Sequence, residues 1–222
     1  MNKVKAKYIK ISSLFLIAMI MIVSYVSSPF STKVSAHDIP SSVTVHMYVK
    51  PEGNTLKLLL RVPLESMSEL VYPTWGPGYL DFEKADSVLL DAAHVYLTEE
   101  LQVYENGVLI EDKMITAYRA TSPQDTSIQN YDTALENIQK PPLTNDERLY
   151  YGQAVLDVLY EFPISSDQSK FSIHPTLNKL ASITNTVLRF LPAGTGERVF
   201  NYIGDPGVVE LDPSLLHALY EF

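Results

Sequence analysis

Hydrophobic and polar residues alternate along the chain in two neighbouring runs. Apolar side chains occupy every second position from residue 43 to 49, and again from residue 56 to 62. A period of two places alternate side chains on one face of a β-strand. The sequence PEGN at residues 51–54 supplies turn residues between the runs. The pattern predicts an antiparallel hairpin with one buried face and with His46 on its polar face.

The next part of the chain mixes a loop, a helix and a hairpin. Residues 63–79 hold three prolines and two glycines, so we expect a loop that lies over the core. Residues 82–101 carry apolar side chains at spacings of three and four, which predicts a helix. The pair Asn106-Gly107 favours a tight hairpin turn between two short strands. A further strand is expected at residues 114–120.

A second insertion interrupts the β pattern. Residues 121–146 are rich in Ser, Thr, Asp and Gln and include the pair Pro141-Pro142. Within them Tyr131, Leu135 and Ile138 have the spacing of a short amphipathic helix.

The remainder of the chain returns to β. Alternation predicts a long strand at residues 154–162 and two more strands within 171–173 and 183–191. The sequence around residues 204–207, GDPG, is typical of a hairpin turn. The whole pattern predicts eight to ten strands and two helices without a βαβ repeat. We therefore expect a mostly β fold, an antiparallel β-sandwich with two helical insertions, in one domain over residues 37–213.

The first 36 residues have the three regions of an export signal. Four lysines lie within the first ten residues, an apolar stretch covers residues 14–26, and a polar tail ends in Val-Ser-Ala. The apolar stretch is shorter than the roughly 20 residues that span a bilayer, and Pro29 interrupts its extension. We expect residues 1–36 to be a cleaved signal peptide rather than a membrane anchor. Cleavage would make His37 the first residue of an exported protein, extracellular or on the cell surface.

Cleavage also changes the charge. The whole chain has 17 Lys+Arg and 26 Asp+Glu, while residues 1–36 hold five lysines and no acid. The remaining 12 basic and 26 acidic residues give a net charge of −14. An acidic domain repels nucleic acid, so we expect no nucleic-acid partner. The chain contains no cysteine, which excludes disulfides and thiolate metal sites.

Motifs of catalysis are absent from the sequence. It contains no G-x-S-x-G, no H-E-x-x-H and no phosphate-binding glycine loop. Adjacent acids such as Glu99-Glu100 point in different directions, whereas acid–base catalysis needs groups that face each other. The sequence therefore predicts a protein that is not an enzyme.

The remaining chemistry lies in the histidines. After cleavage, His37 would offer both its α-amino group and an imidazole nitrogen to one metal ion. Nitrogen donors suit late first-row metals, so a single Cu or Ni ion is the candidate cofactor. We expect His46 to be the third ligand because it lies on the same segment, with His94 and His174 as alternatives. The simpler interpretation is that His37 binds no metal and only happens to follow the cleavage site.

Several separated motifs carry a resemblance to a known family. They are AHDIPSSVTVHMYVKPEGNTLKLLLRVPLESM, YDTALENIQKPPL, LDVLYEFPISSDQSKFSIHPTL and TVLRFLPAGTGERVFNYIGDPGVVELDP, within residues 36–213. They resemble the extracytoplasmic N-terminal region of HupE/UreJ-family membrane proteins. The resemblance implies a partner, the membrane region of the same or a neighbouring protein, and an association with nickel or cobalt handling, to which the nitrogen donors of His37 add copper. A divalent metal is then a candidate ligand.

Two features depart from the family pattern. Leu215 and Leu216 follow the LDP motif where an aromatic residue and a histidine are expected, and the histidine comes only at His217. We expect residues 214–222 to lead toward a membrane region that these 222 residues do not include.

Three functions are thus open. The first is a non-enzymatic extracytoplasmic domain of a HupE/UreJ-like membrane protein. The second is a free secreted metal-binding protein that uses His37, and the third is a structural or adhesion-type sandwich without a ligand.

Overall fold

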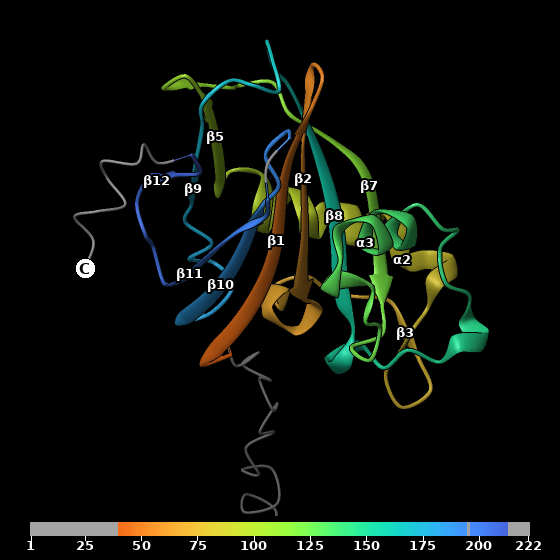
Figure 1. Ribbon diagram of the computed structural model, residues 1–222. Coiled ribbons are helices and arrows are strands. Elements are labelled where there is room, and N and C mark those ends of the chain that lie inside the picture. Colours follow the sequence, from red (N-terminus) through yellow and green to blue (C-terminus); the bar gives the residue numbers. More distant parts are fainter. Residues whose placement is uncertain (1–39, 195, 213–222) are drawn as a thin grey trace, which may run out of the picture. The chain divides into compact units, whose positions relative to one another are not determined.

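The computed structural model describes residues 40–194 and 196–212 (Figure 1). The predicted signal peptide, the predicted metal ligand His37 and residues 214–222 lie outside these residues.

The described residues form strands and short helices in the following order. The strands are β1 (Ser42–Glu52), β2 (Thr55–Pro63), β3 (Thr74–Trp75), β4 (Tyr79–Leu80), β5 (Leu101–Glu105), β6 (Val108–Leu109), β7 (Met114–Thr121), β8 (Val155–Pro163), β9 (Phe171–Pro175), β10 (Ile183–Phe190), β11 (Arg198–Ile203) and β12 (Val209–Glu210). The helices are η1 (Leu64–Met67), α2 (Phe82–Ala93), the π-helical turn η2 (His94–Thr98), η3 (Ser127–Gln129), α3 (Tyr131–Ile138), η4 (Asn145–Glu147) and η5 (Tyr151–Gln153). The predicted mostly β fold with two helical insertions is confirmed.

The strands assemble into two main sheets. A six-stranded sheet has the order β11-β10-β1-β2-β8-β7, and a four-stranded sheet has the order β12-β9-β5-β6. The predicted hairpin β1–β2 pairs antiparallel, with Val49 opposite Leu58. The strand β10, however, pairs with β1 in parallel. The predicted antiparallel sandwich therefore contains one parallel pair. Its paired residues are 141 positions apart in the sequence, and strands so far apart can pair in either direction.

One hydrophobic core joins the two sheets. The inward side chains of β1 and β2 are buried, as predicted from their alternation. They are Val45, Met47, Val49, Leu56, Leu58 and Leu60. They cluster with Val103 of β5 and Ile173 of β9 from the smaller sheet, and with Leu89 of α2. Each buried leucine or valine contributes about 1.5–3 kcal/mol relative to an exposed one.

The opposite face of the large sheet is partly covered by the second insertion. In Figure 1, α2 lies behind the large sheet and α3 in front of it. Tyr48 and Leu59 pack there against Tyr131 and Ile138 of α3 in a second cluster. The prediction that this hairpin has only one buried face is therefore wrong at Tyr48 and Leu59, which are buried on the other face. An amphipathic helix that packs on this face explains why both faces of the central strands carry apolar residues.

Two other boundaries differ from the sequence prediction. The helix predicted for residues 82–101 ends earlier, and Leu101 begins β5 because its side chain is needed in the core. The predicted hairpin around residues 204–207 does not form, since β11 pairs with β10 and β12 pairs with β9 in the other sheet. Among the described residues, no helix has the length and apolar character needed to cross a membrane.

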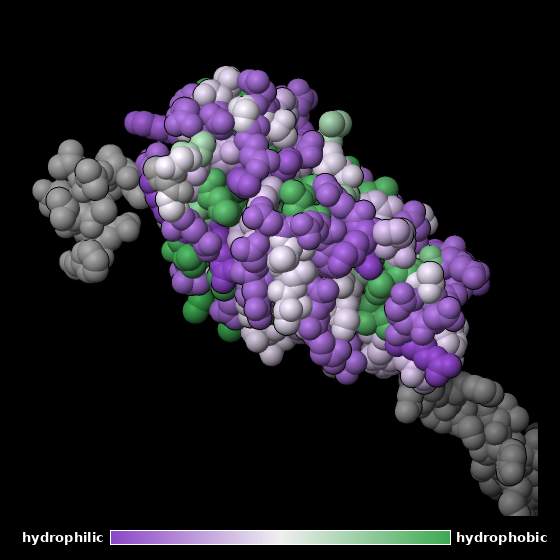
Figure 2. All heavy atoms as spheres, turned by 45° about the vertical axis from the view of Figure 1, so that its right-hand side comes forward, coloured by the Kyte–Doolittle hydropathy of each residue, from purple (hydrophilic) through white to green (hydrophobic). Residues whose placement is uncertain are grey.

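One face of the described domain is largely polar. Figure 2 shows a face on which hydrophilic side chains surround small, separate apolar patches. No single apolar patch on this face stands out as a binding surface.

Candidate functional site

The predicted metal ligand His46 lies between two arginines. It is partly buried on β1, directly opposite Arg61 of β2. Burial lowers the pKa of His46, and the charges of Arg189 and Arg61 lower it further. The imidazole is thereby kept neutral, which a metal ligand requires, but the same two guanidinium groups repel a divalent cation.

The structure does not bring the described histidines together. His46 lies in the six-stranded sheet and His174 in the four-stranded sheet. The imidazole Nε2 of His174 lies 2.8 Å from a carboxylate oxygen of Asp205, and His94 is exposed at the start of η2. Within residues 40–194 and 196–212, no three His, Asp or Glu side chains group closely enough to hold a metal ion. The Cu or Ni site at His37 and His46 stays a prediction that depends on the undescribed N-terminus.

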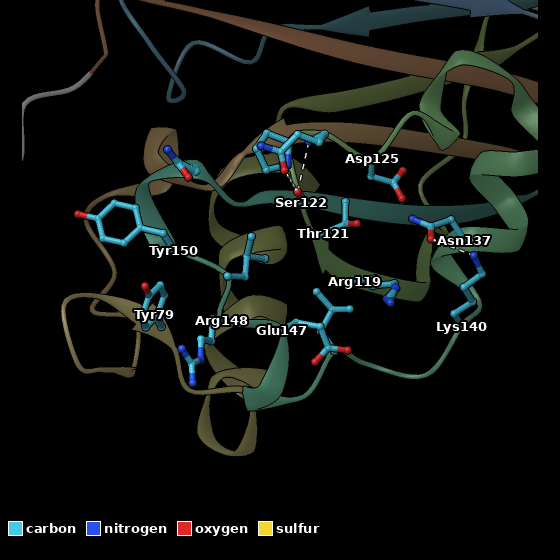
Figure 3. Close-up of a pocket in the computed structure, with 15 residues that line it drawn as sticks. Tyr79, Arg119, Thr121, Ser122, Asp125, Asn137, Lys140, Glu147, Arg148 and Tyr150 are labelled. Carbon is cyan, nitrogen blue, oxygen red and sulfur yellow. Dashed lines mark hydrogen bonds between the residues drawn. The ribbon is translucent and has the colours of Figure 1, made fainter.

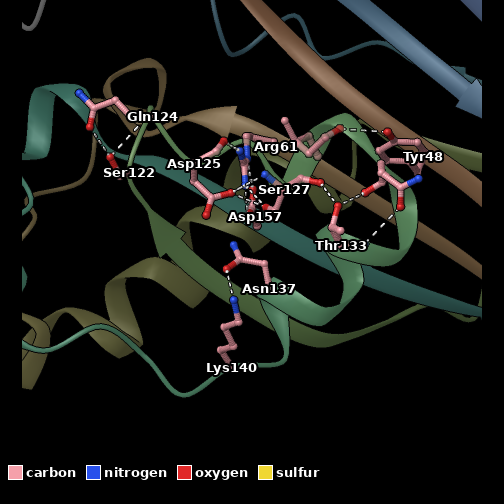
Figure 4. Close-up of polar contacts among 12 residues, drawn as sticks. Tyr48, Arg61, Ser122, Gln124, Asp125, Ser127, Thr133, Asn137, Lys140 and Asp157 are labelled. Carbon is pink, nitrogen blue, oxygen red and sulfur yellow. Dashed lines mark hydrogen bonds and ion pairs between the residues drawn. The ribbon is translucent and has the colours of Figure 1, made fainter.

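A row of charged side chains crosses the large sheet beneath α3. Arg61 of β2, Asp157 of β8 and Arg119 of β7 occupy directly opposed positions on three adjacent strands. Arg61 donates to both carboxylate oxygens of Asp157, from Nε at 2.6 Å and from Nη2 at 2.7 Å (Figure 4). The two side chains are only 7% and 2% exposed, so this is a buried ion pair.

The guanidinium of Arg61 also fixes the loop that precedes α3. Its Nη1 donates to the carbonyl oxygen of Asp125 at 2.7 Å, and its Nη2 to the Asp125 carboxylate at 3.1 Å. Burial would lower the pKa of Arg61, but hydrogen bonds and charge attraction from Asp157 and Asp125 outweigh it and raise that pKa. Burial also raises the pKa of Asp157 against the effect of Arg61. We regard the pair as ionic because an arginine stays protonated and both oxygens of the carboxylate accept from it.

A pocket of about 590 Å³ opens next to this row. Its wall combines the end of β7, the loop after it, the end of α3 and the segment that leads to η5 (Figure 3). The lining residues are Tyr79, Arg119, Thr121, Ser122, Pro123, Gln124, Asp125, Asn137, Lys140, Leu143, Glu147, Arg148, Leu149, Tyr150 and Gln153. In Figure 3, Arg119 and Asn137 lie on one side of the pocket, and Tyr79 and Tyr150 on the other.

Local sequence signals hold the pocket wall in place. The Asn130 side chain caps the start of α3 by accepting from the backbone N–H groups of Asp132 and Thr133. Pro141-Pro142 follow the helix and prevent its extension. A capping box between Thr144 and Glu147 then orders the next turn.

The aromatic side of the pocket requires one glycine. Gly78 has a φ of +116°, and a Cβ atom at this position would lie 2.8 Å from the ring of Tyr150. The backbone N–H of Tyr151 donates to the carbonyl of Gly78 at 3.0 Å, which ties the two loops together. A side chain at position 78 would displace Tyr150 from the pocket.

Two residues that line the pocket carry buried hydrogen-bond donors without an acceptor in the part of the chain that the structure describes. Nε and Nη1 of Arg119 and Nδ2 of Asn137 are buried, and none has a partner among the described residues. Asn137 as a whole is only 4% exposed. Most buried polar groups in folded proteins are hydrogen-bonded, so such orphaned donors need an explanation.

The carboxylates around the pocket are already engaged. Both oxygens of Asp157 accept from Arg61, and Glu147 accepts from the backbone and hydroxyl of Thr144 at 2.9 and 2.7 Å. Those bonds from Thr144 lower the pKa of Glu147, and the charge of Arg119 adds a smaller effect. For Asp125, burial favours a higher pKa, but hydrogen bonds from Ser127 and Arg61 outweigh it and lower the pKa. In the pocket wall, one carboxylate oxygen of Asp125 and one of Glu147 therefore accept hydrogen bonds, beside the unpartnered donors of Arg119 and Asn137.

Sequence reasoning did not identify this pocket. Its signal was present in the charges that interrupt apolar strands: Arg61 within LLLRV, Asp157 within VLDVLY and Arg119 within AYRAT. A charged residue at such a position is rarely buried unless it is paired. The pairing itself depends on strand order, which the sequence does not reveal.

Comparison with known proteins does not assign the chain to a family. No protein-family model matches the chain, and no curated protein matches it at a significant level. The resemblance to the HupE/UreJ family therefore rests on the sequence motifs quoted above.

Proposed function

We propose that this chain is a non-enzymatic extracytoplasmic domain that binds a small ligand beside the membrane region of a HupE/UreJ-like protein. The observation that carries the proposal is the cavity of about 590 Å³ lined by Arg119 and Asn137, two residues with buried donors that have no partner among the described residues. A cavity of this size with a few convergent polar groups is typical of small-molecule sites. The export-type leader and the family resemblance support the extracytoplasmic location and the membrane partner.

The pocket fits binding better than catalysis. The hydroxyl of Ser122 donates to the Gln124 side chain at 2.8 Å, and none of the described lining residues is a histidine that would activate it. The association with nickel, cobalt or copper belongs to the same proposal through the resemblance, and its candidate ligand is His37.

A thermal-shift panel on the exported chain tests ligand binding. Neutral, cationic and anionic metabolites are added separately, and at least one is expected to raise the melting temperature by mass action. Gln124→Trp places a large side chain at the exposed rim of the pocket and should abolish the shift. Gln168→Trp, an exposed glutamine outside the pocket, serves as the matched control and should keep the shift. A panel in which no compound distinguishes these two variants would contradict the proposal.

A further inference from the structure

We propose that the pocket binds an oxyanion, the carboxylate or phosphate group of a small organic molecule, through Arg119, Asn137 and Lys140. The inference rests on the proposed function, because it names the ligand class of the same pocket. The pocket wall combines unpartnered donors with carboxylates that already accept hydrogen bonds.

Arg119 provides the principal charge. It lies beside Asp157 on the neighbouring strand, but Arg61 donates to both oxygens of that carboxylate. Nε and Nη1 of Arg119 consequently remain buried without an acceptor in the described part of the chain. A guanidinium presents its N–H groups as a planar fork, a geometry that matches a carboxylate or phosphate group.

Asn137 is a second, independent indication of a ligand. Its side chain lines the pocket from the last turn of α3, is 4% exposed and has no acceptor for Nδ2 within the described ranges. Its Oδ1 lies 3.5 Å from Nζ of Lys140, which brings the ammonium group to the same wall (Figure 4). A buried donor without a partner leaves its desolvation cost unrecovered, and an oxyanion would recover this cost because it only accepts hydrogen bonds.

The charge of the pocket favours an anion over a neutral acceptor. Arg119, Lys140 and Arg148 line the pocket together with only two carboxylates, those of Asp125 and Glu147. The Asp125 carboxylate bonds Arg61 and Ser127, and the Glu147 carboxylate bonds Thr144. The local excess of cationic groups stands out in a chain whose net charge is −9.

The rest of the pocket indicates an organic body on the anion. Tyr79, Leu143 and Tyr150 line the same cavity as the cationic groups. A cavity of about 590 Å³ is much larger than an inorganic phosphate ion needs, and aromatic walls favour an apolar part of a ligand.

Calorimetric titration of the exported chain separates the ligand classes. Benzoate and phenyl phosphate represent organic oxyanions, inorganic phosphate represents the bare anion, and benzamide is the neutral match for benzoate. We expect benzoate or phenyl phosphate to bind at least about tenfold more tightly than benzamide, the effect of one charged hydrogen bond. Whichever of the two binds more tightly identifies the carboxylate or the phosphate as the natural head group. Inorganic phosphate should bind more weakly than the organic oxyanions.

Variants distinguish a role in binding from a purely structural role, because stability and oxyanion affinity should change in different directions. Asn137→Leu removes a buried, partly unsatisfied amide, so the free protein should melt at the same or a higher temperature while oxyanion affinity falls about tenfold. Lys140→Gln, at an exposed position, should weaken oxyanion binding severalfold, whereas Lys170→Gln, an exposed lysine elsewhere, should not.

Two results would overturn the inference. Equal affinity for benzoate and benzamide would show that charge is not recognised, and unchanged oxyanion binding in both Asn137→Leu and Lys140→Gln would place the anion elsewhere. A neutral ligand whose binding Gln124→Trp abolishes would leave the proposed binding function standing while the oxyanion inference fails.

Discussion

Replacement of Asp157 by leucine should destabilise the domain strongly. The substitution removes the carboxylate that accepts two hydrogen bonds from Arg61, at 2.6 and 2.7 Å, between strands β2 and β8. Leucine keeps the branched shape of the aspartate side chain, so the change creates no cavity and tests the loss of the ion pair together with the fit of two larger methyl groups. The guanidinium of Arg61, whose side chain is 7% exposed, would stay charged and lose its best partner.

The expected cost follows from this burial. Removal of one partner from a buried ion pair typically costs about 3–5 kcal/mol, because the other charge remains desolvated. Asp125 keeps two bonds to Arg61 after the substitution, which places the expectation near the lower end, about 3 kcal/mol. That is a large fraction of the roughly 5–15 kcal/mol by which a domain is stable.

A double-mutant cycle measures the interaction energy between Arg61 and Asp157. Arg61→Met combined with Asp157→Leu removes both charges, so the double variant should be more stable than the sum of the single effects predicts, by about 2 kcal/mol. Urea unfolding followed by circular dichroism gives the four free energies of unfolding. A cost below about 1 kcal/mol for Asp157→Leu, or strictly additive effects, would refute the buried ion pair as described.

Three further predictions concern the first strand and the N-terminus. Val45→Asp should unfold the domain, because its side chain is fully buried and a lone carboxylate there costs several kcal/mol, whereas Thr44→Asp on the exposed side should be nearly silent in thermal melting. The lowered pKa of His46 means that the unfolded chain binds its proton more readily than the folded one. Stability should therefore fall as the pH drops below about 6.5 and less so in His46→Gln, as pH-dependent urea unfolding would show, while an unchanged slope would contradict the lowered pKa. Mass spectrometry should find His37 at the mature N-terminus, and one added glycine before it should abolish calorimetric binding of copper or nickel, since the amine ligand is displaced; equal affinities would remove the metal hypothesis.

The strands were predictable where one face is buried throughout. Alternation over residues 43–49 and 56–62 placed the inward side chains of β1 and β2 correctly, because period-two burial leaves a direct record in the sequence. The tight turn at Asn106-Gly107 also forms between β5 and β6, as predicted. These signals are local, so they do not depend on the rest of the fold.

The pairing of distant strands was not predictable in this way. The parallel contact of β1 with β10 joins segments that no short turn connects, and β11 and β12 enter different sheets although only residues 204–208 separate them. The GDPG sequence does favour a turn, but a turn does not determine which strands then pair. Which strands pair depends on the complete core, because the strand order must bury the apolar faces of all strands and helices at once.

The helical insertion at residues 121–146 links the fold to the candidate site. The sequence indicates α3 through its amphipathic spacing, and this same helix covers Tyr48 on the large sheet and places Asn137 in the pocket. Its apolar face packs on a rigid sheet, which holds the polar residues at its end in a fixed position. Variation within the insertion would therefore alter the lining of the candidate pocket without disturbing the sandwich, provided that the Arg61–Asp157 pair beneath it remains intact. A chain with the same strands but without the insertion would keep the core of the two sheets and lose the Asn137 and Lys140 side of the pocket.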